Sequence, residues 1–86
     1  MYIIVSYDVK AIRCDKINKI LRRYLFQIHN SVFEGSITEK QYKDLQVKIL
    51  NVIEPNEDKI IFYRLQSDKY LRKDYIGTHL KEQIFY

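Results

Sequence analysis

Runs of apolar residues along the chain predict its strands. Residues 2–7 are rich in apolar and β-branched side chains, which is typical of a buried strand, and this run stops at the carboxylate of Asp8. Residues 59–65 form a second strongly apolar run, which predicts a central strand beside the first. Residues 30–35 alternate and close at a glycine, and the charged segment 70–76 predicts an edge strand.

Helical periodicity appears in the two segments between these strands. Apolar residues between positions 13 and 28 follow the 3.6-residue period, which predicts an amphipathic helix. A second stripe of this kind follows Thr38, and Thr38 with Gln41 has the pattern of a capping box that begins a helix. We expect Pro55 to end this second helix, because proline cannot continue the hydrogen-bond ladder.

The order of these elements predicts an α/β fold. Taken as βαββαβ, it indicates a ferredoxin-like sandwich in which two helices cover one face of an antiparallel sheet. The length of 86 residues predicts a single domain, 1–86, with residues 78–86 as a C-terminal tail. A core this small is marginal, and the single cysteine excludes an internal disulfide. We therefore expect a homodimer in which two uncovered sheet faces stack.

Asp8 is the first candidate functional residue. A carboxylate at the end of an apolar strand is costly to bury without a partner, so we expect it at the surface or in a cleft. One interpretation is structural, since aspartate often caps the loop or helix that follows. The other is a Mg²⁺ ligand, because Mg²⁺ is often bound through only one or two carboxylates. Two copies of Asp8 that meet across a two-fold axis would supply such a pair.

The distribution of charge adds a candidate nucleic-acid interface. The net charge is +4, and the basic residues concentrate between positions 10 and 23. Such a block favours a polyanion, although charge runs of this size are more often solvated helix faces. The candidate contacts are Arg13, Lys16, Lys19, Arg22 and Arg23. The sequence shows neither a signal peptide nor an apolar run long enough to cross a bilayer, so we expect a cytoplasmic protein with no membrane partner.

Several motifs together resemble one known family. The segments that carry the resemblance are residues 2–9, Arg23-Tyr24-Leu25, residues 30–35, the helix start at Thr38, residues 60–63 and Ile76-Gly77. Their order and spacing are similar to those of Cas2, the family of small CRISPR-associated adaptation proteins. The chain departs from the family where His29 replaces a common glutamine, and where only Arg13 stands near the position of a denser arginine cluster.

The resemblance implies a set of functions that the residues alone do not give. It implies a homodimer with a shared Mg²⁺ site at Asp8, where Asp8 is also the catalytic residue for cleavage of RNA or duplex DNA. It further implies that the dimer holds protospacer DNA as a bridge between integrase subunits. The expected partners are therefore a second copy, the integrase subunit, DNA and RNA. The tail residues Ile84, Phe85 and Tyr86 would dock on the partner subunit or on the integrase.

The sequence is compatible with three functions from different classes. The first is a binding module for CRISPR adaptation in which Lys16, Lys19 and Arg23 contact phosphates. The second is a magnesium-dependent endonuclease in which Asp8 binds the metal and Arg13 or Arg22 stabilises phosphate charge. The third is a nuclease toxin that shares the fold. We rank the adaptation role first and cleavage second.

Overall fold

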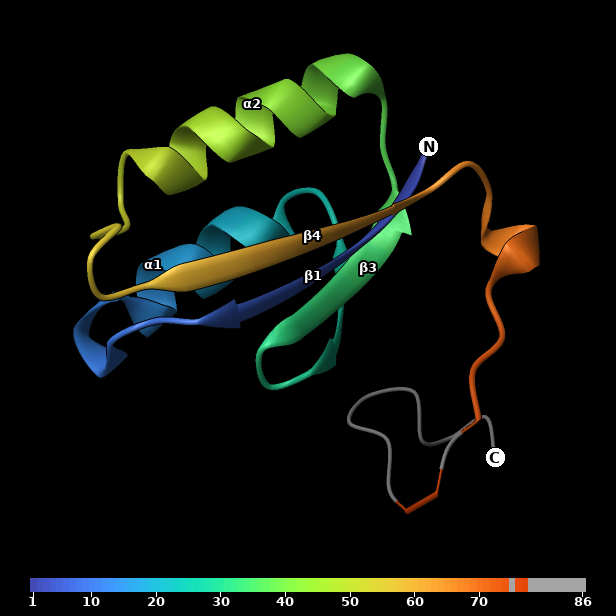
Figure 1. Cartoon of the computed structure of the whole chain (residues 1–86), viewed down its shortest axis with the longest axis horizontal. Coiled ribbons are helices and arrows are strands. Elements are labelled where there is room, and N and C mark those ends of the chain that lie inside the picture. The colour runs from blue at the N-terminus through green and yellow to red at the C-terminus, as the bar shows by residue number, and fades with distance from the viewer. Residues whose placement is uncertain (75, 78–86) are drawn as a thin grey trace.

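The computed structural model describes residues 1–74 and 76–77 (Figure 1). Its elements follow one another as β1 (Tyr2–Asp8), α1 (Ala11–Arg22), β2 (Phe26–His29), β3 (Val32–Ser36), α2 (Glu39–Leu50), β4 (Lys59–Leu65) and a short 3-10 helix, η1 (Asp68–Tyr70). None of the described helices is long and apolar enough to span a membrane.

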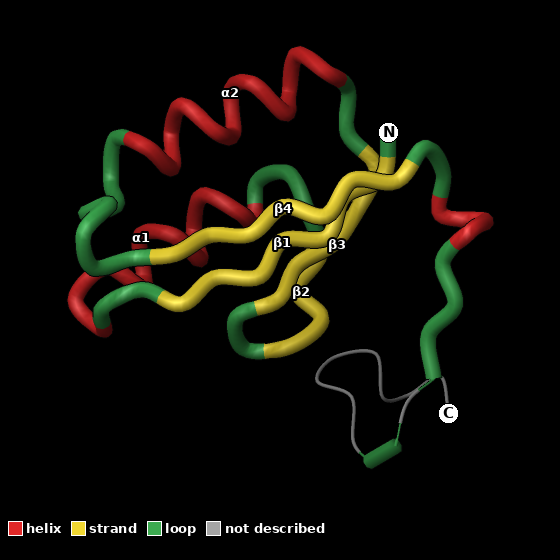
Figure 2. The backbone as a smooth tube through the Cα atoms, viewed as in Figure 1, coloured by secondary structure: helices red, strands yellow, loops and turns green. Residues whose placement is uncertain are grey.

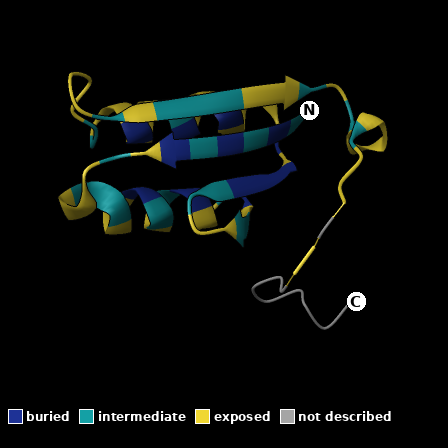
Figure 3. Cartoon of the chain, turned by 60° about the horizontal axis from the view of Figure 1, so that its bottom comes forward, coloured by how far each residue is buried: buried dark blue, intermediate teal, exposed yellow. Residues whose placement is uncertain are grey.

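The strands form one antiparallel sheet of four strands in the order β2-β3-β1-β4 (Figure 2). Strand β1 lies at the centre, and its alternate residues Ile3, Val5 and Tyr7 are buried. Both helices pack their apolar residues into the same core cluster as these three side chains, so both lie on one face of the sheet. Figure 3 shows the resulting alternation of buried and less buried positions along the strands. The predicted ferredoxin-like βαββαβ architecture is confirmed.

The two apolar strands are observed where their patterns predicted them. Strand β1 runs to Asp8 and β4 spans residues 59–65. Residues of β4 pair with β1 along its whole length, from Tyr2 opposite Leu65 to Asp8 opposite Lys59. The predicted central position of β4 is wrong, because β4 is an edge strand of the described sheet.

The first helix is shorter than the predicted span of 13–28. It ends at Arg22, and the Leu25 N–H still donates to the Leu21 carbonyl at 2.9 Å before the chain turns into β2. Residues 26–29 have helical periodicity but pair with β3, which satisfies their backbone groups in a sheet instead. Leu25 is buried beside Gly35, where an added Cβ would lie 3.2 Å from the leucine Cδ2. The predicted strand 30–35 is accordingly the second half of a hairpin, with a turn at residues 30 and 31.

The second helix begins as predicted and ends early. The Thr38 hydroxyl accepts from the Gln41 N–H at 3.0 Å, and the Gln41 side chain accepts from the Thr38 N–H at 2.9 Å. This is the predicted capping box. The helix ends at Leu50, before Pro55, with Asn51 as its C-cap.

The predicted edge strand at 70–76 is absent from the described part of that segment. The chain instead forms η1, in which the Ser67 hydroxyl accepts from the Lys69 N–H and the Leu71 N–H donates to the Asp68 carbonyl. These local hydrogen bonds compete with strand pairing. The tail, residues 78–86, lies outside the described residues.

Candidate functional site

Asp8 is exposed at the end of β1. It lies opposite Lys59 in the antiparallel β1–β4 pair. Helix α1 has Lys10 as its N-cap residue and no side-chain cap hydrogen bond, so Asp8 does not cap this helix. Within residues 1–74 and 76–77 no hydrogen bond or ion pair reaches the Asp8 carboxylate. Its two oxygens are therefore available to an external ligand.

One chain supplies only part of a metal site. Among the described residues, no group of three or more histidine, cysteine, aspartate or glutamate side chains could hold a metal ion. Magnesium retains several waters and is often bound through one or two carboxylates, so a single accessible Asp8 fits half of such a site. The other half would have to come from a second copy of the chain.

Four of the five basic residues predicted to bind nucleic acid lie exposed at α1 and its C-cap: Lys16, Lys19, Arg22 and Arg23. Arg22 donates to the Gln27 side-chain oxygen at 3.4 Å. Over the described part of the chain, the side chains of Lys16, Lys19 and Arg23 have neither a hydrogen bond nor an ion pair. Lys16, Lys19 and Arg23 are therefore three cations without a charge partner among the described residues, two on α1 and one at its C-cap.

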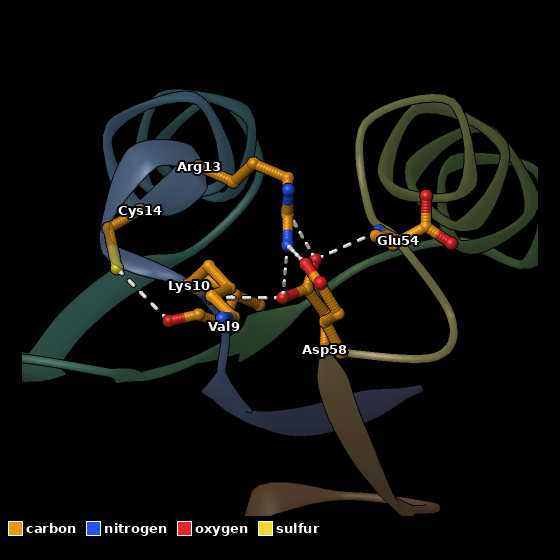
Figure 4. A network of polar contacts seen from close by, with 7 residues as sticks. Val9, Lys10, Arg13, Cys14, Glu54 and Asp58 are labelled. Carbon is orange, nitrogen blue, oxygen red and sulfur yellow. Dashed lines mark hydrogen bonds and ion pairs between the residues drawn. The ribbon is translucent and has the colours of Figure 1, made fainter.

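Arg13, the fifth predicted residue, is held in an ion-pair network at the start of the same helix (Figure 4). Its guanidinium donates to Asp58 through Nε at 2.6 Å and through Nη2 at 3.0 Å. Nη2 also donates to Glu57 at 2.9 Å. Only 20% of the Arg13 side chain is exposed, and the Asp58 side chain is fully covered. The charge of Arg13 is thus paired within the chain, unlike that of Lys16 or Lys19.

Asp58 is a residue that sequence reasoning missed. Besides the two Arg13 contacts, its carboxylate accepts from the Lys10 N–H at 2.9 Å and from the Glu54 N–H at 2.8 Å. Bonding to Arg13, helped by these main-chain donors, holds the pKa of Asp58 well below its usual range, although burial opposes the shift. Hydrogen bonds to Asp58 and Glu57 hold the pKa of Arg13 above its usual value. No local pattern signals this pairing, because Arg13 and Asp58 are 45 residues apart in sequence.

Glu34 is a second unpredicted polar feature. It is buried on β3, and one of its carboxylate oxygens forms an ion pair with the Lys73 ammonium group. The other oxygen, Oε1, is buried and has no hydrogen-bond partner among the described residues. Glu34 lies opposite Ile4 in the β1–β3 pair, so it belongs to the sheet face that the helices leave uncovered. The segment after η1 therefore passes over that face.

The predicted docking residues of the tail, Ile84, Phe85 and Tyr86, lie outside the described residues. The structure therefore shows where Asp8 and the basic residues of α1 lie. The docking of the tail stays a prediction.

Comparison with known proteins gives a consistent match over most of the chain. The family model described as CRISPR associated protein Cas2 matches residues 1–73. A protein of Dictyoglomus turgidum named CRISPR-associated endoribonuclease Cas2 is 40% identical over 86 residues, covering 98% of this chain and 99% of that protein.

Solved structures agree with the sequence matches. A crystal structure of a Cas2 protein superposes with a TM-score of 0.86 at 31% identity, covering 94% of this chain and 91% of the other. The crystal structure of Streptococcus pyogenes Cas2 at pH 6.5 gives a TM-score of 0.81 at 29% identity, covering 90% of this chain and all of the other.

Proposed function

The chain belongs to the CRISPR-associated Cas2 family, and from this premise we propose that it is a homodimeric nucleic-acid-binding protein of CRISPR adaptation with a metal-dependent phosphodiesterase site. The observation that carries the proposal is the exposed Asp8 carboxylate at the end of β1, without a partner in the described part of the chain. The name of its relatives, endoribonuclease, favours RNA as the substrate of cleavage. No described feature favours the alternative of a nuclease toxin.

The face of the sheet opposite the helices supports the homodimer, because the segment after η1 reaches it at Glu34 but leaves Tyr63 exposed. Residues opposite each other in antiparallel strands share a face, and Ile3 and Val5 point into the core. Ile4, between them, therefore points away from the helices together with its partner Tyr63, which is 51% exposed. Large apolar side chains on an uncovered sheet face favour stacking against a second sheet.

In the proposed dimer, Asp8 of each chain would hold one Mg²⁺ ion between the subunits. When bound there, the ion would supply electrostatic stabilisation of the phosphate charge and would make a water more acidic. The protein's own contribution is to present two carboxylates in a fixed orientation. Without the ion, two apposed carboxylates would repel each other.

The exposed cations of α1 support the role in adaptation. Lys16 and Lys19 lie exposed on α1 and Arg23 lies exposed at its C-cap, and none of the three charges is neutralised within the described residues. Such residues contact phosphates and position a duplex without reading its sequence. We therefore propose that these three residues contact the phosphates of protospacer DNA, which the dimer would hold between integrase subunits. The integrase subunits are the proposed protein partners.

The test of the proposed site is Asp8→Ala in the full chain. We expect this variant to lose Mg²⁺-dependent cleavage of single-stranded RNA and duplex DNA, because the shared site loses both carboxylates. Sedimentation should show the same oligomeric state as the parent, since Asp8 is exposed. Asp44→Ala, which removes an exposed carboxylate from α2, is the matched control and should cleave at the parent rate. Cleavage by Asp8→Ala at the parent rate would show that Asp8 is not the metal ligand.

A further inference from the structure

The turn between β1 and α1 is held from two sides (Figure 4). The Val9 carbonyl accepts from the Cys14 thiol at 3.6 Å, and the Lys10 N–H donates to the Asp58 carboxylate at 2.9 Å. Val9 and Lys10 directly follow Asp8. The main chain is therefore anchored immediately beyond the exposed carboxylate.

The Asp58 carboxylate is itself held by several hydrogen bonds. Among the described residues, the Asp58 carboxylate accepts four hydrogen bonds, two from the Arg13 guanidinium and one each from the Lys10 and Glu54 N–H groups. The Asp58 side chain has no exposed surface. Asp58 also directly precedes Lys59, the residue opposite Asp8 in the sheet. One side chain thus connects the first turn of α1 with the loop after α2, next to the β4 residue that pairs with Asp8.

Asp58 also replaces a missing local cap. Helix α1 has no acidic residue in its first turn, and its N-cap residue makes no side-chain cap hydrogen bond. In a capping box the N3 side chain accepts the N-cap N–H, but the N3 residue here is Arg13. Asp58 accepts the Lys10 N–H instead, and places negative charge at the positive end of the helix. The geometry of this turn is therefore determined by a residue from a distant loop.

From this arrangement we infer that Asp58, clamped by Arg13, is a positioning residue that fixes the end of β1 and so orients the Asp8 carboxylate toward its metal. The inference rests on the proposed function of Asp8. It gives Arg13 a role through Asp58 rather than at a phosphate. Residues that orient a metal ligand act by removing its alternative orientations, and their loss typically lowers metal affinity or activity about 10–100-fold.

The chain offers a matched control for this inference. Glu57 is the neighbour of Asp58 and also pairs with Arg13, but its side chain is 46% exposed and makes no hydrogen bond to Val9 or Lys10. Asp58→Asn removes the charge and one acceptor oxygen. Glu57→Gln removes a carboxylate from the same arginine without changing the contact to Lys10.

The experiment measures Mn²⁺ binding by electron paramagnetic resonance and amide hydrogen exchange by NMR in the full-length protein. For Asp58→Asn we expect Mn²⁺ affinity to fall about 10-fold, and exchange to accelerate at residues 9–13 but not in the core strands. Glu57→Gln should match the parent in both measurements. If Asp58→Asn does not fold, Arg13→Lys is measured in the same way, because lysine keeps the charge but loses the two-pronged contact.

The outcomes separate this inference from the function on which it rests. Mn²⁺ binding that is lost in Asp8→Ala but unchanged in Asp58→Asn, despite faster exchange at Lys10, would overturn the positioning role and leave the proposed site intact. Exchange accelerated uniformly over the chain would assign Asp58 to global stability only, and would also overturn the inference. Mn²⁺ binding that is equal in the parent and in Asp8→Ala would refute the proposed metal site itself.

Discussion

Replacing Lys16 and Lys19 with glutamine should flatten the salt dependence of DNA binding. Both lysines are exposed on α1 and carry charges that are not neutralised within the described residues. Each phosphate contact contributes about 0.9 to the slope of log affinity against log salt concentration for duplex DNA. If both lysines of both chains in a dimer contact phosphates, the variant's slope is smaller by about 3.6. Between 50 and 200 mM salt, the parent would then lose about 150-fold more affinity than the variant.

The chain provides a control with the same charge change and spacing. Lys40 and Lys43 are exposed on α2, three positions apart as Lys16 and Lys19 are on α1. The variant Lys40→Gln/Lys43→Gln lowers the net charge of the protein equally but leaves α1 intact. Exposed substitutions of this kind change stability by no more than about 0.5 kcal/mol, so both variants should remain folded.

The assay is fluorescence anisotropy of a labelled duplex titrated with each protein over a series of salt concentrations. A slope that falls in the α1 variant and stays at the parent value in the α2 variant supports phosphate contacts at α1. Equal slopes in the two variants would refute the reasoning, because net charge alone would then account for binding.

Two further predictions concern the fold itself. Leu45→Ala should lower the free energy of unfolding, measured by urea titration, by about 2–5 kcal/mol, because Leu45 is 0% exposed in the core. Leu50 is 64% exposed, so Leu50→Ala should lower it far less. Equal losses in the two variants would contradict the core assignment. The depressed pKa of Asp58, caused first by Arg13, means that its stabilisation is fully present above the ordinary value of 3.8 and is lost as the pH falls toward the folded value. Asp58→Asn should therefore reduce the dependence of stability on pH below about 4, measured by circular dichroism, and an unchanged acid transition would contradict the pairing.

Local patterns in the sequence determined the elements whose physical cause is short-range. The apolar runs of β1 and β4, the capping box at Thr38 and the amphipathic faces of the two helices each depend on residues close in sequence, so their periods predict them. The position of Asp8 followed from the same reasoning, since a carboxylate at the end of a buried strand has to be exposed or paired. These patterns indicated the ferredoxin-like fold but not its full order of elements, because they placed residues 26–29 in the first helix and a strand at residues 70–76.

The tertiary structure decided everything that depends on which distant segment a residue meets. Residues 26–29 carry a helical period, but a hairpin with β3 satisfies their backbone groups and overrides it. Arg13 looked equivalent to the other cations of its segment, and only Asp58, 45 positions away, distinguishes it. Glu34 and Lys73 meet across 39 positions for the same reason. The periodicity of a short stretch of sequence predicts its secondary structure, whereas the partner of a charged side chain depends on how the whole chain packs.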